Sequence, residues 1–365
     1  MRKRILFIMH MPPPIHGAAM VGQYIRDSKI INDEFECHYI NLATSEKLSE
    51  IGKFNWKKIF RFFNLLFQII RLIKKTKPNL IYITPNAKGG AFIKDFIIVQ
   101  CVKIVNNNIV IHYHNKGVSS FQNKPIYNLL YNSFFKNIKV ILLAEPLYYD
   151  IKKYVNRENV YICANGIPDT NQNIQINENT QVPTILFLSN MMKEKGVYEL
   201  LDACCLLRKR GSIFKCIFIG AWKDICEKDF RQKCNDYELN EFVYALGPKY
   251  GEGKNDFLRE SDIFVFPTYY HNECFPLVLL EAMSYGKASI STNIAGIPSI
   301  IDNEKTGVLI KPNDSIELAN TIEILLKDPE LRKKMGEEGR KKFEREFTLE
   351  CFEKRITNIL NVNLK

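Results

Sequence analysis

Short apolar runs alternate with longer helical stretches along the whole chain. Several of these runs in the first half are continuous stretches of β-branched or apolar residues, as expected for strands that helices cover on both faces. They lie at residues 5–9, 36–40, 80–83, 109–113, 140–143 and 160–163. Helical periodicity appears between them, near 18–29, 54–75, 91–104, 125–136 and 146–154. Repeated strand–helix units of this kind predict a parallel, doubly wound α/β sheet.

The alternation is interrupted by a polar segment. Residues 169–182 are rich in Asn and Gln and lack periodicity, which predicts a linker. Beyond it we expect strands at 185–188, 216–219, 242–246 and 263–266, and helices at 195–210, 224–238, 276–285, 315–327 and 329–346. The pattern therefore predicts two Rossmann-like domains, 1–168 and 183–347, facing each other across a ligand-binding cleft. A last amphipathic helix, in 348–365, is expected to pack back on the first domain.

Composition agrees with this division. A chain of 365 residues exceeds the usual size of one core. No apolar run is long enough to span a membrane, and the run at 5–9 is too short for a secretory signal. The ten cysteines contain no Cys-x-x-Cys pair, which indicates reduced, mostly buried thiols in a cytoplasmic protein.

The net charge of +11 comes from the first half of the chain. Residues 1–180 contain 24 Lys and Arg against 12 Asp and Glu, whereas the rest contain 27 against 28. This asymmetry suggests an anionic partner: a membrane surface, a phosphorylated substrate or a nucleic acid. Nucleic acid is not expected, because no recognisable binding motif is present.

The helix at 54–75 contributes much of this charge. Its central apolar residues predict ordinary packing against the sheet. It also suggests peripheral contact with an anionic membrane at the inner face, through aromatic residues and flanking basic ones. These are Trp56, Phe60, Phe63, Lys57, Lys58, Arg61, Lys74 and Lys75.

Two carboxylates, Glu273 and Glu281, lie eight positions apart across a loop and the helix that follows it. The helix is expected to begin near Pro276, because proline suits a first helical turn, and to carry Glu281 two turns further on. Unpaired backbone N–H groups at such a start favour anions. The segment can thus bind a sugar hydroxyl, a ribose and, between them, a phosphate.

Three further candidates follow expected strands. Gly17 opens a helix with little side-chain bulk, which suits a phosphate or sugar but also a turn used only for packing. His114 ends a strand and is a candidate cleft residue, whereas His112 lies within the strand as a candidate core residue. Lys195 lies at a strand-to-helix junction, where it can neutralise a diphosphate. A Gly-x-Gly-x-x-Gly motif is absent, which disfavours an NAD enzyme.

These elements together resemble a family 4 glycosyltransferase, a retaining enzyme of the GT-B fold. The matching segments are PPPIHGAA, ICANGIP, SNMMKEKGVYELLDA, SDIFVFPTYYHNECFPLVLLEAMSYGKASIST, AGIPSII, EKTGVLIKPND and DPELRKKMGEEGR. The resemblance implies a nucleotide-diphosphate-sugar donor in the second domain and a glycan or lipid-linked acceptor in the first. It also implies a role in assembling cell-surface polysaccharide or glycolipid.

The resemblance assigns roles residue by residue. Glu273, His114 and Lys195 match the catalytic positions, with Glu273 on the donor sugar, His114 beside it and Lys195 on the phosphates. Glu281 matches the ribose-binding residue, and Gly17 the loop near the phosphates. The remaining donor-binding positions are Asn190, Lys193, Cys274, Phe275, Pro276 and Leu277.

The chain departs from the family at three positions. Asn190 stands where many members have an arginine that binds the diphosphate, so Lys193 and the backbone at 275–277 are expected to assist Lys195. Cys274 replaces a glycine, and Ala295 replaces the first of two glycines.

No Asp-x-Asp occurs, which fits a site without metal or cofactor. The resemblance implies attack from the face of departure, assisted by the leaving phosphate. Two alternatives remain open: another sugar-nucleotide enzyme, such as an epimerase or phosphorylase, and a non-catalytic sugar-nucleotide-binding protein.

Overall fold

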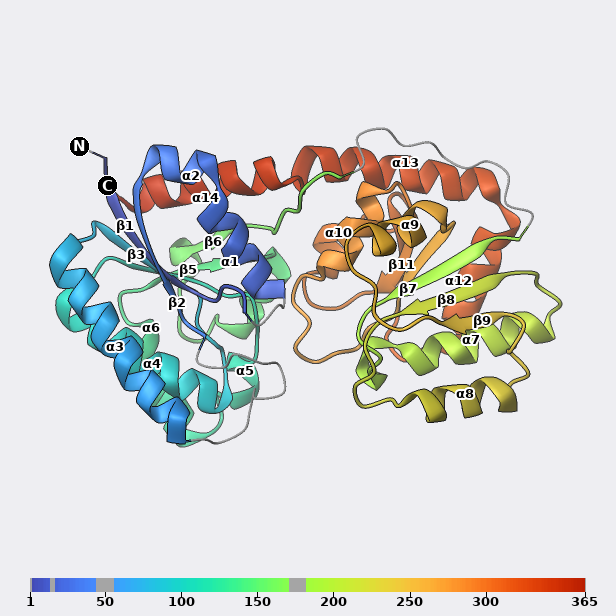
Figure 1. Cartoon of the computed structure of the whole chain (residues 1–365), viewed down its shortest axis with the longest axis horizontal. Coiled ribbons are helices and arrows are strands. Elements are labelled where there is room, and N and C mark those ends of the chain that lie inside the picture. The colour runs from blue at the N-terminus through green and yellow to red at the C-terminus, as the bar shows by residue number, and fades with distance from the viewer. Residues whose placement is uncertain (1, 14–16, 44–55, 171–181, 365) are drawn as a thin grey trace. The chain divides into compact units, whose positions relative to one another are not determined.

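The computed structural model describes residues 2–13, 17–43, 56–170 and 182–364. The chain divides into two compact units, of which unit 1 is Met1–Gly166 with Leu349–Lys365 and unit 2 is Ile167–Thr348 (Figure 1). Each has a six-stranded parallel sheet, which confirms the predicted α/β class with two doubly wound sheets. Most of the linker predicted at 169–182 lies outside the described residues.

The sheet of unit 1 has the order β2-β1-β3-β4-β5-β6. Its strands are β1 (Arg4–Met9), β2 (Glu36–Asn41), β3 (Leu80–Ile83), β4 (Ile109–His112), β5 (Lys139–Leu142) and β6 (Val160–Ile162). All four residues of β3 and of β4 are buried, as expected for central strands covered on both faces. All six runs predicted from the first half of the sequence are strands.

Helices cover both faces of this sheet. They are α1 (Gly17–Asp27), α2 (Lys29–Glu34), α3 (Trp56–Thr76), α4 (Gly89–Val105), α5 (Val118–Phe121), α6 (Pro125–Phe135) and α14 (Leu349–Asn363). Right-handed crossovers place α3, α4 and α6 on one face, because each connects strands in the same direction across the sheet. Figure 1 shows them on the side of the sheet away from α2 and α14.

Two helical details of unit 1 differ from the sequence prediction. The helix expected at 146–154 is a 3-10 helix, η2 (Glu145–Asp150), and a second one, η3 (Arg157–Asn159), precedes β6. The short helices α2 and α5 were not predicted, because six and four residues are too few to show a helical period.

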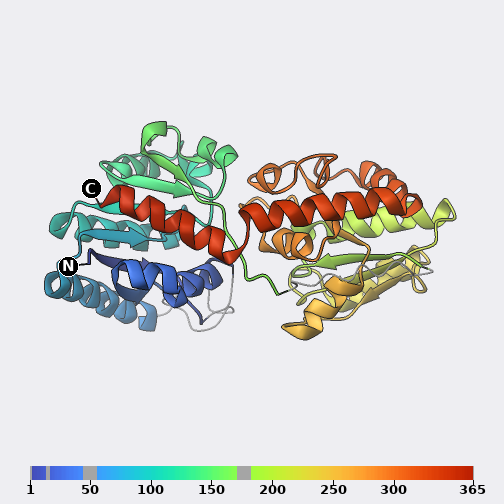
Figure 2. The same cartoon turned by 90° about the horizontal axis from the view of Figure 1, so that it is seen from above.

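The C-terminal helix α14 packs on unit 1, against α2. It buries Phe352, Ile356 and Leu360. Asn108 Nδ2 donates a hydrogen bond of 2.9 Å to the carbonyl of Asn363, which ties the helix end to the start of β4. Figure 2 shows this helix lying along unit 1 as the red segment that ends at C.

The sheet of unit 2 has the order β12-β11-β10-β7-β8-β9. Its strands are β7 (Thr184–Leu188), β8 (Lys215–Ile219), β9 (Val243–Ala245), β10 (Ile263–Phe266), β11 (Ala288–Thr292) and β12 (Gly307–Ile310). Its helices are η4 (Lys193–Lys195), α7 (Val197–Lys209), α8 (Glu227–Asp236), α9 (Glu252–Glu260), α10 (Leu277–Ser284), α11 (Ile297–Ile300), α12 (Ser315–Lys327) and α13 (Pro329–Glu346).

The sequence prediction missed α9, β11 and β12 in unit 2, and also the four-residue helix α11. The strand β11 has the sequence ASIST, and its small polar residues hide the apolar pattern. Ser291 is fully buried and donates a hydrogen bond of 2.7 Å to the carbonyl of Phe266 on the neighbouring strand β10. A serine that is satisfied in this way can occupy a core strand.

Among the described residues, no helix combines the length and apolar character needed to cross a bilayer.

Candidate active site

The candidate residues of unit 2 follow two neighbouring strands. β7 and β10 are parallel partners, with Ile185 opposite Ile263. The chain after β7 carries Lys195 and the chain after β10 carries Glu273, so both loops leave the same edge of the sheet. The carboxyl edge of a parallel sheet is the usual place for a ligand site.

Lys195 and Glu273 meet at this edge. Nζ of Lys195 lies 2.6 Å from Oε2 of Glu273, and the two side chains are 14% and 10% exposed. The Thr268 hydroxyl donates a weaker hydrogen bond of 3.5 Å to the same oxygen. Oε1 of Glu273 has no donor among the contacts of the described residues and is available to a ligand. An ammonium has three N–H groups, so Lys195 also keeps donors for further acceptors.

Aromatic rings lie against this ion pair. Nζ of Lys195 is 4.5 Å from the ring centre of Tyr270 and 5.3 Å from that of Phe266. Asn272 Nδ2 donates a hydrogen bond of 3.1 Å to the Tyr270 hydroxyl and holds this ring. Cation–π attraction therefore helps to fix the ammonium group at the sheet edge.

A glycine allows the two loops to approach. Gly196 has φ of 86°, and a Cβ there would lie 2.3 Å from the carbonyl oxygen of Pro267. Beside it, the backbone N–H of Tyr269 donates a hydrogen bond of 2.8 Å to the carbonyl of Glu194. A larger residue at 196 would separate the loops and with them Lys195 from Glu273.

A second contact between these loops was not predicted. The Glu194 carboxylate lies 2.8 Å from Nδ1 of His271, and this hydrogen bond lowers the pKa of Glu194. Both residues lie inside segments that resemble the family, but nothing in their spacing indicates a pair.

Glu281 has a different partner. It is the fifth residue of α10, hence in the second turn, and its Oε1 lies 2.9 Å from Nζ of Lys254 in α9. Its Oε2 is buried and has no hydrogen-bond partner among the described residues. A buried acceptor left open in this way suits a hydroxyl donor from a ligand. Lys254 was not a sequence candidate, because the helix that carries it was missed.

The start of α10 differs in detail from the expectation. Pro276 is the residue that caps the helix, and Leu277 is the first helical residue. Because proline has no N–H group, the backbone donors at 275–277 are those of Phe275 and Leu277. Phe275 is buried.

Cys274 and Ala295, which replace glycines of the family, differ in backbone conformation. Cys274 has no positive φ and is buried, so the backbone there does not require glycine. Ala295 has φ of 51°, a left-handed conformation that favours glycine. The neighbouring N–H of Gly296 donates a hydrogen bond of 2.9 Å to the carbonyl of Cys274, which holds the two segments together.

Asn190 and Lys193 are exposed at the start of the loop after β7. The backbone N–H of Lys193 donates to Asp224 Oδ1 at 3.2 Å. Neither side chain is joined by a described contact to the Lys195–Glu273 pair, so the structure brings together Lys195 and Glu273 and leaves these two candidates outside the cluster.

In unit 1, His114 lies two residues beyond the end of β4 and is partly exposed. The ring of His112 lies 4.2 Å from it, centre to centre. His112 is fully buried, and its Nδ1 is 2.6 Å from the Tyr82 hydroxyl, which confirms it as a hydrogen-bonded core residue. Burial lowers the pKa of His112 and raises that of Tyr82, so both are neutral beneath His114.

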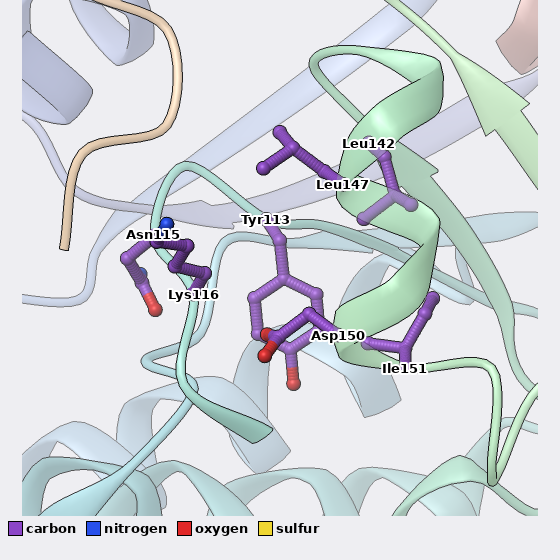
Figure 3. Close-up of a pocket in the computed structure, with 7 residues that line it drawn as sticks. All are labelled: Tyr113, Asn115, Lys116, Leu142, Leu147, Asp150 and Ile151. Atoms are coloured by element: carbon purple, nitrogen blue, oxygen red, sulfur yellow. The ribbon is translucent and has the colours of Figure 1, made fainter. Parts of the chain in front are cut away.

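The loop after His114 borders a small pocket. Figure 3 shows its lining: Tyr113, Asn115, Lys116, Leu142, Leu147, Asp150 and Ile151. Asp150 accepts hydrogen bonds from the backbone N–H groups of Gly117, Val118 and Ser119 at 2.8, 3.1 and 3.0 Å. The buried carboxylate thus orders the chain just after His114. Gly17 is exposed at the first position of α1, and no atom outside its own helix lies within 4 Å of the place of a Cβ.

In the part of the chain that the structure describes, no group of three or more His, Cys, Asp or Glu residues could hold a metal ion.

Comparison with known proteins gives these residues a family context. Residues 169–342 match the family model described as glycosyl transferases group 1. The chain is 26% identical over 321 residues to the capsular polysaccharide biosynthesis glycosyltransferase CapM of Staphylococcus aureus, which covers 82% of this chain and 81% of that protein.

Solved structures with the same fold match nearly the whole chain. The apo form of the lipopolysaccharide outer core galactosyltransferase WaaB has a TM-score of 0.76, with 15% identity and coverage of 98% of this chain and 99% of WaaB. Anabaena HepE in complex with UDP-glucose has a TM-score of 0.72, with 16% identity and coverage of 98% and 99%. At such identities the likeness shows the fold alone.

The two parallel α/β units have the GT-B fold that these solved glycosyltransferase structures share. The chain is therefore similar to the group 1 glycosyltransferases, through residues 169–342 of unit 2 and through its likeness to CapM.

Proposed function

We propose that this glycosyltransferase moves a hexosyl group, with retention and without a metal ion, from a nucleoside-diphosphate sugar to a glycan or lipid-linked acceptor. The Lys195–Glu273 ion pair at the carboxyl edge of unit 2 carries this proposal. A cation and an acceptor oxygen, fixed together on rigid strand ends, match a substrate that has a diphosphate next to a sugar. The names of CapM and WaaB place those proteins in the assembly of cell-surface polysaccharides, and we propose the same setting here.

Unit 2, which contains the predicted domain 183–347, holds the donor in this proposal. Lys195 binds the diphosphate with the N–H groups that Glu273 does not occupy, and Oε1 of Glu273 accepts from a hydroxyl of the sugar. The unpartnered Oε2 of Glu281 accepts from the ribose. The N–H groups of Phe275 and Leu277, at the start of α10, add phosphate donors.

Unit 1, which corresponds to the predicted domain 1–168 up to Gly166 and includes the C-terminal helix, holds the acceptor. His114 and Gly17 lie at the carboxyl edge of its sheet, and His114 faces the transferred sugar in the proposed complex. Asn190, Lys193, Cys274 and Pro276 complete the donor site. In this proposal the basic first half of the chain contacts an anionic membrane at the cytoplasmic face, which suits a lipid-linked acceptor.

The chemical step follows from these positions. The bond between the anomeric carbon and the leaving phosphate oxygen breaks as the acceptor oxygen forms a bond on the same face. The acceptor's proton passes to the leaving phosphate. Lys195 stabilises the charge that develops on the diphosphate, which is the interaction that lowers the barrier.

A panel of nucleoside-diphosphate sugars in a thermal-shift assay identifies the donor, because a ligand that binds the folded state raises the melting temperature. Turnover is then measured as release of the nucleoside diphosphate with and without acceptor. We expect release that depends on acceptor and is lost in Glu273→Gln, with Glu241→Gln, an exposed position of unit 2, as the control. A donor that binds without acceptor-dependent release, or full turnover in Glu273→Gln, would contradict the proposal.

A further inference from the structure

The outer surface of three helices in unit 1 is not explained by sugar transfer. The helices α3, α4 and α6 cover one face of the sheet, with α4 packed between the other two (Figure 1). In an ordinary α/β domain, helices in such a layer bury one apolar face and present polar residues to water. These three do not.

The helix α3 is apolar on two opposite sides. Leu65, Ile69 and Ile73 form its buried side. On the opposite side, Phe60, Phe63 and Phe67 are exposed by 76%, 61% and 66%. Positions i, i+3 and i+7 lie in one row along a helix, so the three rings form a continuous aromatic stripe.

The neighbouring helices extend this surface. On α4, Ile93, Ile97 and Ile104 are exposed at positions i, i+4 and i+11, again in one row. On α6, Ile126 and Leu129 are exposed by 72% and 71%. We call these eight residues the apolar helix face. A contiguous apolar surface on adjacent elements marks an interaction site, whereas single exposed residues do not.

The charges on the three helices have one sign. Together the helices contain a single acidic residue, Asp95, which is buried and lies 3.2 Å from Nζ of Lys94. The stripe on α3 continues in its own row with the exposed residues Arg71 and Lys74, which stand eleven and fourteen positions after Phe60. Lys124, exposed at the start of α6, flanks the other side. Apolar rings bordered by basic residues, with no exposed acid between them, complement an anionic surface with an apolar interior.

We propose that the apolar helix face docks this glycosyltransferase on a lipid bilayer that contains anionic headgroups. Phe60, Phe63 and Phe67 insert at the level between headgroups and acyl chains, and the basic residues around them contact the phosphates. A second copy of the chain fits this surface less well, because a two-fold contact would bury its basic residues against a face that has no exposed acidic partner.

The position of this face within unit 1 suits the proposed acceptor. Helices that connect parallel strands run antiparallel to them, so the first turns of α4 and α6 lie toward the carboxyl edge of the sheet, where His114 and Gly17 lie. A docked bilayer would then be next to the edge that receives a lipid-linked acceptor. The link between docking and a lipid-linked acceptor rests on the proposed function. Binding to lipid does not, because it requires no turnover.

Vesicle flotation with the full-length protein tests the docking. The vesicles are phosphatidylcholine alone or phosphatidylcholine mixed with phosphatidylglycerol. We expect the wild-type protein to float with the mixed vesicles and less with the neutral ones, and the floating fraction to fall as salt rises. The combined change Phe60→Ser, Phe63→Ser and Phe67→Ser should weaken binding at least about tenfold. Arg71→Glu with Lys74→Glu should weaken it about fivefold or more for each charge removed.

Matched variants in unit 2 control for general effects. Ile213→Ser, Ile316→Ser and Ile324→Ser remove three equally exposed apolar side chains, and Lys209→Glu with Lys228→Glu makes the same change in charge. We expect both to float like wild type. The thermal shift caused by the donor should be unchanged in every variant, which separates failed docking from failed donor binding and from misfolding.

Two results would overturn the docking. One is equal flotation of the wild type and the Phe→Ser variant. The other is a dimer without lipid, seen by light scattering, that the same variant dissociates, because it would assign the face to a second copy. Flotation that is equal on neutral and anionic vesicles would remove the part played by Arg71 and Lys74.

Discussion

Lys195 and Glu273 are 78 residues apart in the chain, yet Nζ of one lies 2.6 Å from Oε2 of the other. Two parallel neighbours, β7 and β10, end at the same edge and deliver the two loops there. Gly196 permits the close approach of the loops, and Tyr270 lies against the ammonium group. The pair is therefore a product of the fold, and in the proposed function its two members act on different parts of the donor.

Substitution of Glu273 should separate these roles. Glu273→Gln removes the carboxylate that the sugar hydroxyl contacts, so we expect transfer to fall about a hundredfold. Binding of the nucleoside diphosphate without sugar should be unchanged or tighter, because Lys195 no longer shares its charge. Initial rates and calorimetry with the free nucleoside diphosphate measure the two effects. Weaker binding of the nucleoside diphosphate in Glu273→Gln would refute this division.

Substitution of Lys195 should act on both binding and stability. Lys195→Met removes a diphosphate contact and leaves Glu273 with a nearly buried, unpaired charge. We expect weaker binding of the nucleoside diphosphate by about tenfold or more, and a loss of about 1–3 kcal/mol in the free energy of unfolding. The double variant Lys195→Met with Glu273→Gln should recover part of the stability but not the binding. Additive losses of stability in denaturant unfolding would show that the pair is not coupled.

The two oxygens of Glu281 give a contrast between neighbouring variants. Glu281→Gln weakens the acceptor proposed for the ribose, so it should weaken donor and nucleoside diphosphate alike, by about tenfold. Lys254→Met leaves the open Oε2 in place and should have a smaller effect on both. Calorimetry with the donor and with the free nucleoside diphosphate measures both affinities in each variant. Loss of donor binding alone, with the nucleoside diphosphate unaffected, would place Glu281 at the sugar instead.

Ala295 offers a test of backbone strain. A left-handed conformation costs an L-residue about 1–2 kcal/mol, and glycine avoids this cost but has more freedom when unfolded. Ala295→Gly should therefore raise the stability of unit 2 by about 0.5–1 kcal/mol, measured by thermal or denaturant unfolding. Ala91→Gly, in the regular helix α4, should instead lower stability by about 1 kcal/mol. Destabilisation by Ala295→Gly would show that the surroundings of this residue favour the alanine.

The sequence predicts the sheets better than it predicts the site. Continuous apolar runs show the central strands β3 and β4, whose residues are all buried, whereas the edge strand β2 has the mixed sequence ECHYIN. In unit 2, β11 is hidden by its serines, of which Ser291 donates to the carbonyl of Phe266 on β10 and Ser289 to that of Lys287 just before the strand. Lys195 and Glu273 are recognisable from their positions at strand ends and from the family resemblance. The partner of Glu281 is not, because α9 reaches α10 only through the tertiary fold and Lys254 belongs to no motif.

The exposed residues of α3 are also only partly predictable from the sequence. The sequence indicates an aromatic and basic helix, and it also predicts that central apolar residues pack on the sheet. Which phenylalanines remain outside depends on the register of the helix against its sheet, and the structure leaves Phe67 exposed, a residue not among those expected to face a membrane. The contributions of α4 and α6 to the same surface follow only from the order of the strands.

Lys287 provides a prediction about pH. Burial lowers the pKa of its ammonium group to about 8, although Nζ donates a hydrogen bond of 2.8 Å to the carbonyl of Arg259. The unfolded chain keeps the ordinary pKa of about 10.4, so between pH 8 and this value the unfolded state binds more protons. The free energy of unfolding should rise with pH across this window. The stability linked to the neutral form of Lys287 is fully present above the unfolded pKa, and it is lost as the pH falls through 8 and the buried amine becomes charged.

Lys287→Met isolates this contribution from other titrating groups. The variant has no charge to bury, so its stability relative to wild type should be most favourable near pH 7 and should decline as pH rises through the window, by no more than about 3 kcal/mol in all. Lys334→Met, at an exposed position of α13, is the control, and its difference from wild type should not change in this way. Denaturant unfolding at a series of pH values measures both. A difference in stability between Lys287→Met and wild type that is constant with pH would contradict this prediction. It would mean that the ammonium group keeps its charge in the folded protein throughout. In that case the carbonyl of Arg259 and the nearby Asp262 outweigh the loss of solvent.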